Sequence, residues 1–299
     1  MKTKTPGVKC PLCGYSCEQP IVGSVRGNTA RFKETLFPLW KCPQCATLLS
    51  LDDVDFEDIY RDYPPSNRNR PLDFFAKASL GNLLSRLKKG GLSQEGRILD
   101  FGCGNGNFLE LLKIRGYRNV VGYDPYVTDF SQKPRGLFDC VVANDVIEHV
   151  PDPRGLITAC AQLVKPGGLL YVGTADSEPV DIHKLDSHLL RLHQPFHRVI
   201  LTEKGLHQIA EETGMKMLRH WKRSYMDTLL PFINYTFLDK FNGAHNYNMD
   251  KAMGPNNSAI LFKKPSLFFY GLFGYFIPSA WEPAVLLKNT IFPSSQKKS

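Results

Sequence analysis

The sequence predicts an α/β fold in which a largely parallel sheet, flanked by helices, follows a small cysteine-rich N-terminal module. Three observations carry this prediction. From residue 97 onward, short apolar runs alternate with segments of helical periodicity, as in a sheet built from strand–helix–strand crossovers. A glycine-rich turn separates the first such strand from its helix, and two C-x-x-C pairs stand in the first 45 residues.

Composition sets wide bounds on function. The chain has 299 residues, 42% of them hydrophobic, and a formal net charge of +8, which is ordinary for a globular protein with a mild basic excess. Such an excess permits nucleic acid, anionic lipid or an anionic substrate as partner and requires none of them, since a solvated surface explains it. The polar start, MKTKTPGVKC, has no apolar segment of a secretion signal, so we expect a cytoplasmic location.

Residues 1–50 are expected to form a zinc ribbon. Each C-x-x-C makes a tight turn that presents two thiolates to one ion, and two such turns give a closed structural site with four sulfur ligands. These ligands are Cys10, Cys13, Cys42 and Cys45. Cys17 is a spare thiol outside the pattern, and a reduced, metal-free module is the alternative. Removal of the zinc is expected to destabilise this module without directly touching the ligand site of the core described below.

Residues 51–96 are expected to form a helical connector. The stretch 51–60 is acidic, 64–71 is a turn-rich break, and 72–89 has the periodicity of an amphipathic helix. The connector becomes basic after Arg61, which would suit a phosphate-facing strip, although a solvated helix face explains it more simply.

The core opens with RILDFGCGNGNFLELL at residues 97–112, which predicts a strand, a glycine turn and a helix. Gly102, Gly104 and Gly106 alternate with other residues in the turn. Because glycine lets the backbone approach a ligand closely, such a unit is typical of sites that bind a ligand at a helix N-terminus. Glycine turns also occur where only tight packing requires them. The neighbouring residues are therefore needed to tell whether this turn binds a ligand.

Two carboxylates beside the turn indicate the ligand. Asp124 ends the next expected strand, 119–124, where a carboxylate can accept hydrogen bonds from both hydroxyls of a ribose. Asp100, just before the first glycine, would repel a pyrophosphate but suits an ammonium group. A ligand with a ribose and a cationic amino-acid end therefore fits better than a dinucleotide.

The alternation continues to residue 226 and gives way to an apolar extension. Further elements are expected in the order strand, helix, strand, helix, strand at 138–145, 156–164, 167–175, 203–214 and 215–225. The extension 227–299 is expected to complete the sheet with a strand at 282–289 and is a candidate part of the substrate pocket. Its run SLFFYGLFGYFIPSAW is too short to span a bilayer in comfort. We expect a core or dimer-contact helix there, with a membrane-surface patch as the alternative.

Four blocks, LDFGCGNG, GYDP, FDCVVANDVIEHVPDP and LVKPGGLLYVGTA, occur in an order and spacing that resemble class I S-adenosylmethionine-dependent methyltransferases. The chain resembles most the branch that contains ubiquinone-biosynthesis O-methyltransferases, over about residues 95–220. This resemblance implies a seven-stranded Rossmann-like sheet with the cofactor over the carboxyl ends of the strands. The zinc ribbon is similar to that of glycan-pathway methyltransferases, although the sugar C-methyltransferases also carry a further C-terminal domain for which this chain has too little length.

The resemblance also implies roles for individual residues. The methionine part of S-adenosylmethionine would be bordered by Asp100, Gly102, Gly104 and Gly106, its ribose bound by Asp124, and the pocket after the fourth strand lined by Asn144, Asp145 and Val146. Residues 125–138 are too few for the helix and third strand of the family. The adenine contact therefore has no assigned residue, and Asp129 is the one candidate.

Methyl transfer requires mainly that the nucleophile be aligned with the S–CH3 bond, because the sulfonium methyl is already electrophilic. A general base assists when the nucleophile is a hydroxyl, and His149 and His197 are the candidates. Helix capping or packing is the alternative role for His149. In ubiquinone-type enzymes an acid followed by Glu-His can hold a divalent metal, and Asp145, Glu148 and His149 match that pattern.

The stretch 183–197 contains four histidines and follows the fifth strand, where members of the family build a substrate lid. His193 and His197 have the i, i+4 spacing of a helix, but Pro195 between them argues against a regular helix and a second metal site. We interpret them as polar lid residues that contact substrate.

Three classes of function stay open at this point. The favoured one is methyl transfer from S-adenosylmethionine to an oxygen, nitrogen or carbon of a small-molecule, glycan or lipid-linked acceptor. An RNA methyltransferase would use the ribbon and the basic connector, but the ribbon's aromatic residues form no clear stacking pattern. A non-catalytic cofactor-binding or interaction protein is the third class, and the intact Asp100, glycines and Asp124 argue against it. A homodimer is compatible with all three.

Overall fold

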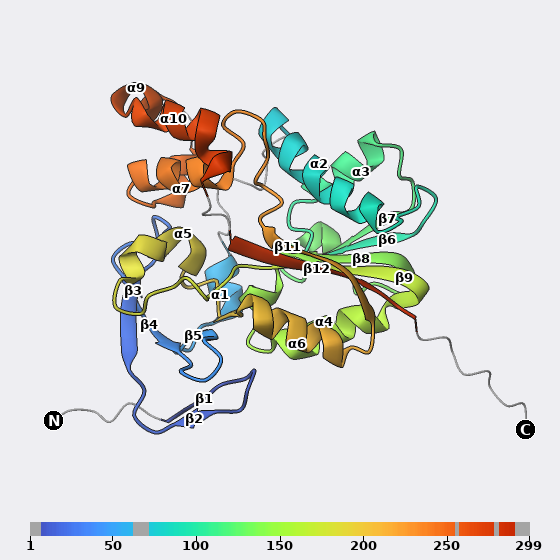
Figure 1. Ribbon diagram of the computed structural model, residues 1–299, viewed down its shortest axis with the longest axis horizontal. Coiled ribbons are helices and arrows are strands. Elements are labelled where there is room, and N and C mark those ends of the chain that lie inside the picture. The colour runs from blue at the N-terminus through green and yellow to red at the C-terminus, as the bar shows by residue number, and fades with distance from the viewer. Residues whose placement is uncertain (1–6, 62–71, 255–256, 278–280, 291–299) are drawn as a thin grey trace, which may run out of the picture.

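Figure 1 shows the computed structural model of the chain, which describes residues 7–61, 72–254, 257–277 and 281–290. A mixed β-sheet occupies the middle of the molecule. Its strands lie in the order β11 (Lys216–Arg223), β12 (Trp281–Lys288), β9 (Val164–Gly173), β8 (Phe138–Asn144), β6 (Ile98–Phe101) and β7 (Val120–Tyr123). The pairs β9–β8, β8–β6 and β6–β7 are parallel, whereas β12 runs antiparallel to both of its neighbours.

Within the described residues this sheet has six strands, where the family resemblance implied seven. The difference lies after β7, where a single 3-10 turn at Thr128–Phe130 precedes β8. A parallel crossover with its helix needs a dozen or more residues and a further strand needs several more, so this short segment cannot supply both. β7 is therefore the edge of the sheet. The strand expected at 282–289 is confirmed as β12.

Helices cover both faces of the sheet (Figure 1). They are α2 (Phe74–Lys89) and α3 (Asn107–Ile114) on one face, and α4 (Pro153–Gln162) and α6 (Glu203–Glu212) on the other. Val142 packs in the cluster beneath α2 and α3, while its neighbour Val141 packs in the cluster on the other face. Both valines are fully buried. The sheet is thus a buried central layer, as parallel sheets with flanking helices are.

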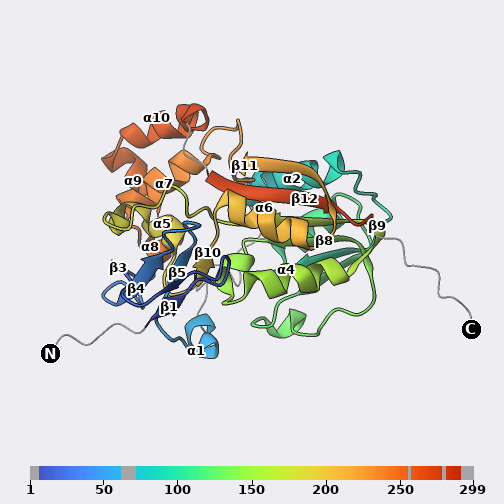
Figure 2. The ribbon, with the colours of Figure 1, turned by 60° about the horizontal axis from the view of Figure 1, so that its bottom comes forward.

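The N-terminal module has the β character expected of a ribbon. Its strands are β1 (Val8–Lys9), β2 (Ser16–Cys17), β3 (Val22–Arg26), β4 (Leu36–Lys41) and β5 (Leu48–Ser50). β3, β4 and β5 pair in antiparallel order, and β5 pairs in addition with β10 (Val199–Ile200), as Figure 2 shows. β10 belongs to the stretch that follows β9, so the sheet of the N-terminal module is completed by a strand from the histidine-rich segment.

The stretch between β9 and α6 carries a 3-10 turn (Leu185–His188), α5 (Leu189–Leu192) and β10. A small α1 (Phe56–Tyr60) begins the connector, and the turn-rich break at 64–71 lies outside the described residues. After β11 a helical cap forms at one end of the sheet (Figure 1). The cap consists of α7 (Tyr235–Ala244), α8 (Met249–Met253), α9 (Ala259–Lys263), α10 (Ser266–Phe273) and the 3-10 turn Gly274–Phe276.

The apolar run that begins at residue 266 is helical only as far as Phe273. It was expected to be buried in the core or at a dimer contact, and the first of these expectations is wrong for one side of α10, because Phe269 and Phe273 are about half exposed. Across the described ranges, no helix combines the length and apolarity that a membrane span requires.

Candidate active site

The glycine turn joins the end of β6 to the start of α3. Gly102, Gly104 and Gly106 have φ values of 75°, 52° and 81°, a left-handed conformation that favours glycine. A Cβ on Gly102 would lie 2.4 Å from Cγ2 of Val146, so Val146 presses directly on the turn. A Cβ on Gly104 would meet no atom within 4 Å. The turn is thus tightly packed at its first glycine and open at its second, which leaves backbone accessible to a ligand.

Asp124 holds this turn from the end of β7. Its Oδ2 accepts a hydrogen bond from the Gly104 N–H at 3.1 Å, and its Oδ1 accepts one from the Tyr126 N–H at 2.9 Å. Asp100 lies nearby at the end of β6, and burial together with the charge of Asp124 raises its pKa to about 7. An ammonium group between turn and carboxylate would relieve that repulsion. Two carboxylates beside an open glycine turn therefore fit a ligand that carries an ammonium group and a ribose, as S-adenosylmethionine does.

The end of β8 supplies the next three predicted residues. Asn144 donates a hydrogen bond from Nδ2 to Oδ2 of Asp145 at 3.0 Å, and the Asp145 N–H donates to the Gly173 carbonyl at 2.9 Å. Asp145 has a φ of 55°, which few residues other than glycine adopt. Such strained backbone concentrates at binding and catalytic sites. Because Val146 packs on Gly102, this bend and the glycine turn form one continuous wall.

His149 and His197, the two candidate bases, lie together although 48 positions separate them in the chain. Their ring centroids are 4.7 Å apart. His197 Nδ1 donates to the Arg191 carbonyl at 2.7 Å, which leaves its Nε2 as the ring atom with a lone pair. Burial lowers the pKa of His197 to about 4, and burial with the nearby His197 lowers the pKa of His149 well below its usual range. Both rings are therefore neutral at pH 7.

His193, the third histidine of this segment, packs on the same cluster. Its ring centroid lies 5.2 Å from that of His197, and its Nδ1 is 2.8 Å from Oδ1 of Asn28 in the N-terminal module. The cluster is thus held partly by a residue of the cysteine-rich module.

Two tyrosines that the sequence analysis missed connect the region beside the glycine turn to the histidines. The Tyr60 hydroxyl, at the end of α1, lies 2.6 Å from Nδ1 of His149. The Tyr60 ring stacks on Tyr126, with a centroid distance of 4.4 Å and an interplanar angle of 4°. Tyr126 stands two residues after Asp124, and this closeness was the one signal that could have singled it out. Nothing in the pattern around Tyr60 indicated its place.

A possible metal set also differs from the expected one. Ligand atoms of Glu148, His149 and His197 lie within 4.8 Å of one another, and Asp145 is not among them. Glu148 is held by a hydrogen bond from Thr174 Oγ1 to its Oε2 at 2.8 Å. In the part of the chain that the structure describes, His197 thus takes the place that the sequence pattern gave to Asp145. Two imidazoles with one carboxylate would suit zinc or a similar transition metal better than magnesium.

A further buried acid, Glu282, lies near Asp145. Glu282 lies at the start of β12, and burial with the charge of Asp145 raises its pKa to about 8. The Tyr225 hydroxyl bonds to Asp145, and Glu282 bonds to Ser224. Oε2 of Glu282 is buried without a hydrogen-bond partner among the described residues. The sequence analysis placed Glu282 in the last strand but did not mark it as a site residue.

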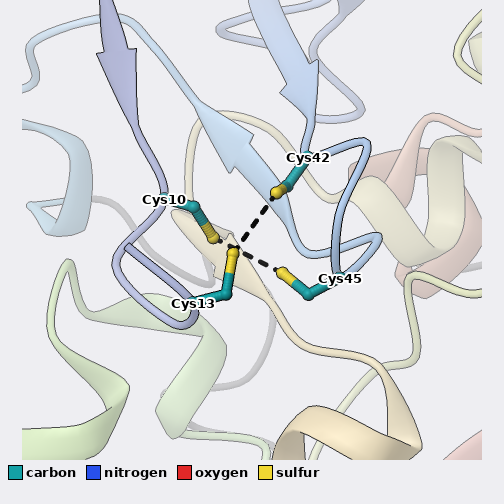
Figure 3. Close-up of side chains that lie close together, drawn as sticks. All are labelled: Cys10, Cys13, Cys42 and Cys45. Carbon is teal, nitrogen blue, oxygen red and sulfur yellow. Dashed lines mark hydrogen bonds between the residues drawn. The ribbon is translucent and has the colours of Figure 1, made fainter. Parts of the chain in front are cut away.

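The four cysteines of the N-terminal module converge as a metal site requires (Figure 3). The Sγ atoms of Cys10 and Cys45 are 3.5 Å apart, those of Cys13 and Cys42 are 3.6 Å apart, and all four lie within 4.8 Å of one another. Cys17, on β2, is not part of this group. Four thiols from two turns, with no position left for a substrate, fit a structural zinc ion.

Comparison with known proteins agrees with this geometry. A family described as a methyltransferase domain matches residues 71–220. The ubiquinone biosynthesis O-methyltransferase of Dechloromonas aromatica is 30% identical over 151 residues, 42% of this chain and 62% of that protein. That of Escherichia coli O9:H4 is 28% identical over 187 residues, 55% of this chain and 72% of that protein.

Among solved structures, a putative sarcosine dimethylglycine methyltransferase from Galdieria sulphuraria has a TM-score of 0.48 and 15% identity, over 80% of this chain and all of that chain. The chain spans 62% of the Dechloromonas relative and 54% of relatives from Xanthomonas oryzae, less than two thirds of their length. Since the family match covers half of the chain and includes the glycine turn and the strands β6 to β9 described above, the chain belongs to the class I S-adenosylmethionine-dependent methyltransferases.

Proposed function

We propose that the protein transfers the methyl group of S-adenosylmethionine to a hydroxyl oxygen of a small-molecule or lipid-linked acceptor. The observation that carries this proposal is the neutral His149–His197 pair next to the bend after β8. The names of the relatives from Dechloromonas and Escherichia, which are O-methyltransferases of ubiquinone biosynthesis, support oxygen as the nucleophile.

Each predicted cofactor residue has a role in this proposal. When bound, S-adenosylmethionine supplies an electrophilic methyl on a positively charged sulfur. Asp100 balances the amino group, Asp124 accepts hydrogen bonds from the ribose, and the open backbone at Gly104 lets the cofactor approach. Asn144, Asp145 and Val146 would line the pocket at the end of β8.

His197 is the proposed general base. Its Nδ1–H is fixed on the Arg191 carbonyl, so its Nε2 can accept the proton of the acceptor hydroxyl as the new O–CH3 bond forms and the S–CH3 bond breaks. The Arg191 carbonyl then stabilises the imidazolium through the same hydrogen bond. Tyr60 holds the neighbouring His149 ring in place, and His149 in turn packs edge-on against His197.

The experiment that tests the proposal follows labelled methyl from S-adenosylmethionine into a host extract separated into small molecules, lipids, glycans, RNA and protein. We expect label in the small-molecule or lipid fraction, as a methyl ether, with no label from Asp100→Ala. His197→Gln should bind cofactor normally and transfer label at least about a hundredfold more slowly. Label in RNA, or cofactor binding with no label in any fraction, would contradict the proposal.

A further inference from the structure

The outer side of α10 is apolar where a surface helix should be polar. Leu267 and Gly271 face the cap and are buried, whereas Phe268, Phe269, Leu272 and Phe273 project outward and are 41–55% exposed. A surface helix normally has one apolar stripe, and a helix that is apolar around its whole circumference is normally covered on all sides. Only one side of α10 is covered within the described residues.

This exposure does not come from a loosely docked helix. Asn234 is buried and donates hydrogen bonds from Nδ2 to the carbonyls of Tyr270 and Gly271, at 3.1 and 3.2 Å. The Phe232 N–H donates to the Gly271 carbonyl at 2.7 Å. A Cβ on Gly271 would lie 2.3 Å from the Phe232 ring, so helix and ring are in tight contact. The cap therefore holds the outer aromatic side in a fixed position.

The neighbouring elements also expose aromatic side chains. Phe262 on α9 is 84% exposed and Phe276, in the turn after α10, is 72% exposed. Lys263 and Lys264 join α9 to α10, and residues 257–277 contain no aspartate or glutamate. We call the exposed residues the aromatic patch; it consists of Phe262, Phe268, Phe269, Leu272, Phe273 and Phe276. Figure 1 shows α9 and α10 at the end of the molecule opposite β1 and β2.

We propose that the aromatic patch docks on the surface of a membrane that contains anionic lipid. The inner part of a protein–protein interface is depleted in lysine, whereas membrane-surface helices combine exposed Phe and Leu with lysines that reach the headgroups. Two lysines with no nearby acid in sequence complement an anionic surface. The proposal goes beyond methyl transfer and stands on this surface alone, so it does not depend on the function proposed above.

The test is sedimentation of the full chain with vesicles of phosphatidylcholine, alone or in an equal mixture with phosphatidylglycerol. We expect binding to the mixed vesicles, and a partition lowered more than about tenfold in the variant Phe262→Ser/Phe269→Ser/Phe273→Ser, which removes apolar area that would enter the lipid. Lys263→Ala/Lys264→Ala should lower the partition on mixed vesicles by about fivefold for each lysine and leave neutral vesicles unaffected.

The matched control is Ile114→Ser/Leu137→Ser, which removes exposed apolar side chains outside the cap, at the end of α3 and just before β8. It should bind vesicles as the original chain does, and thermal unfolding should show that all variants fold. Absence of binding to mixed vesicles, or an equal loss in the control, overturns the proposal. A second result would also overturn it: sedimentation velocity shows a dimer of the original chain and a monomer of the triple serine variant, and neither binds vesicles. The partner of the aromatic patch would then be a second copy of the chain.

Discussion

The hydroxyl of Tyr60 lies 2.6 Å from Nδ1 of His149, across 89 residues of sequence. The same tyrosine ring stacks on Tyr126, which follows the carboxylate that supports the glycine turn. One side chain of the connector thus links the cofactor side of the site to the histidine cluster. Its hydroxyl and its ring have separate partners, and a conservative substitution can separate them.

Tyr60→Phe removes the hydroxyl and keeps the stack. We expect the free energy of unfolding to fall by only about 1 kcal/mol, the usual contribution of one hydrogen bond. Methyl transfer should slow by roughly tenfold, because the His149 ring loses the group that orients it. Tyr60→Leu, which loses the stack as well, is the comparison. A Phe variant with unchanged transfer and a Leu variant with lost transfer would show that only the stack matters.

The raised pKa of Asp100 predicts a pH-dependent affinity for the cofactor. The pKa of Asp100 is about 7 in the folded protein, against an ordinary value of 3.8. Between these two values the folded state keeps the proton that the unfolded state has lost. The cofactor-free protein therefore loses stability as the pH rises from about 4 to 7. An ammonium ligand prefers the ionised carboxylate. The affinity for S-adenosylmethionine should therefore rise by roughly tenfold between pH 6 and pH 8 and level off above.

Calorimetry at several pH values checks this, and two controls isolate Asp100. Asp145 and Glu148 also have pKa values raised to about 7, so the slope alone does not identify the group. Asp100→Asn should bind more weakly with little dependence on pH. Methylthioadenosine, which lacks the amino-acid end, should bind the unmodified chain without the slope. A slope that persists in Asp100→Asn would assign it to another carboxyl.

Asp124→Ala should weaken cofactor binding by about 1–3 kcal/mol, the cost of leaving polar partners unsatisfied. Part of this loss comes from the glycine turn, because the Gly104 N–H loses its acceptor. Asp53→Ala is the matched control, since Asp53 is an exposed residue that precedes α1 and has no assigned role in the site. Isothermal titration of both variants gives the comparison, and equal affinities would remove the ribose assignment from Asp124.

Gly102→Ala and Gly104→Ala should differ although both glycines have positive φ. Alanine costs roughly 1–2 kcal/mol in the left-handed conformation at either position. At Gly102 the Cβ also meets Val146 at 2.4 Å, which adds roughly 1–3 kcal/mol of overpacking. Urea unfolding should rank Gly102→Ala as the less stable variant, with recovery in Gly102→Ala/Val146→Ala. Gly104→Ala should instead lower mainly cofactor affinity, and equal stability of the two alanine variants would contradict the contact.

Metal analysis should find one zinc per chain held by the four cysteines, lost in Cys13→Ser and retained in Cys17→Ser. A chelator should then raise amide exchange through residues 7–50. We expect exchange to rise as well at β10, because β10 pairs with β5, while residues 102–106 stay protected. Exchange confined to residues 7–50 would show that the pairing contributes little. A second zinc, lost in His197→Ala, would occupy the Glu148–His149–His197 group.

The sequence predicted the layered α/β core because hydrophobic periodicity records which face of each element is buried. It also predicted β12, although nothing in the pattern gave its antiparallel position between β9 and β11. Asp100, Asp124 and the glycines could be chosen as cofactor candidates because they stand next to each other in a strand–turn–helix unit. Their proposed roles still rest on the resemblance to class I S-adenosylmethionine-dependent methyltransferases.

His149 and His197 were each chosen from the sequence, but their meeting in one cluster could not be predicted, because its members meet only through tertiary contacts. His149 follows β8, His197 returns from the stretch after α5, and Tyr60 comes from the connector. Spacing in sequence instead pointed to Asp145 as the partner of Glu148 and His149. Local spacing describes neighbours within one element, whereas a loop that crosses the sheet edge brings in residues from elsewhere.

The pairing of β5 with β10 has a consequence for how this chain can be divided. Arg198 lies next to β10, forms an ion pair with Asp52 at 3.1 Å, and donates its backbone N–H to the Glu148 carbonyl. The stretch that carries His197 is thus held on one side by the cysteine module and the start of the connector, and on the other by the 3-10 turn after β8. A fragment that begins at residue 72 would keep the glycine turn but lose the surface on which its histidines are assembled. The cysteine-rich module thus positions the stretch that carries His197. A chain without this module should still bind cofactor but should not transfer the methyl group.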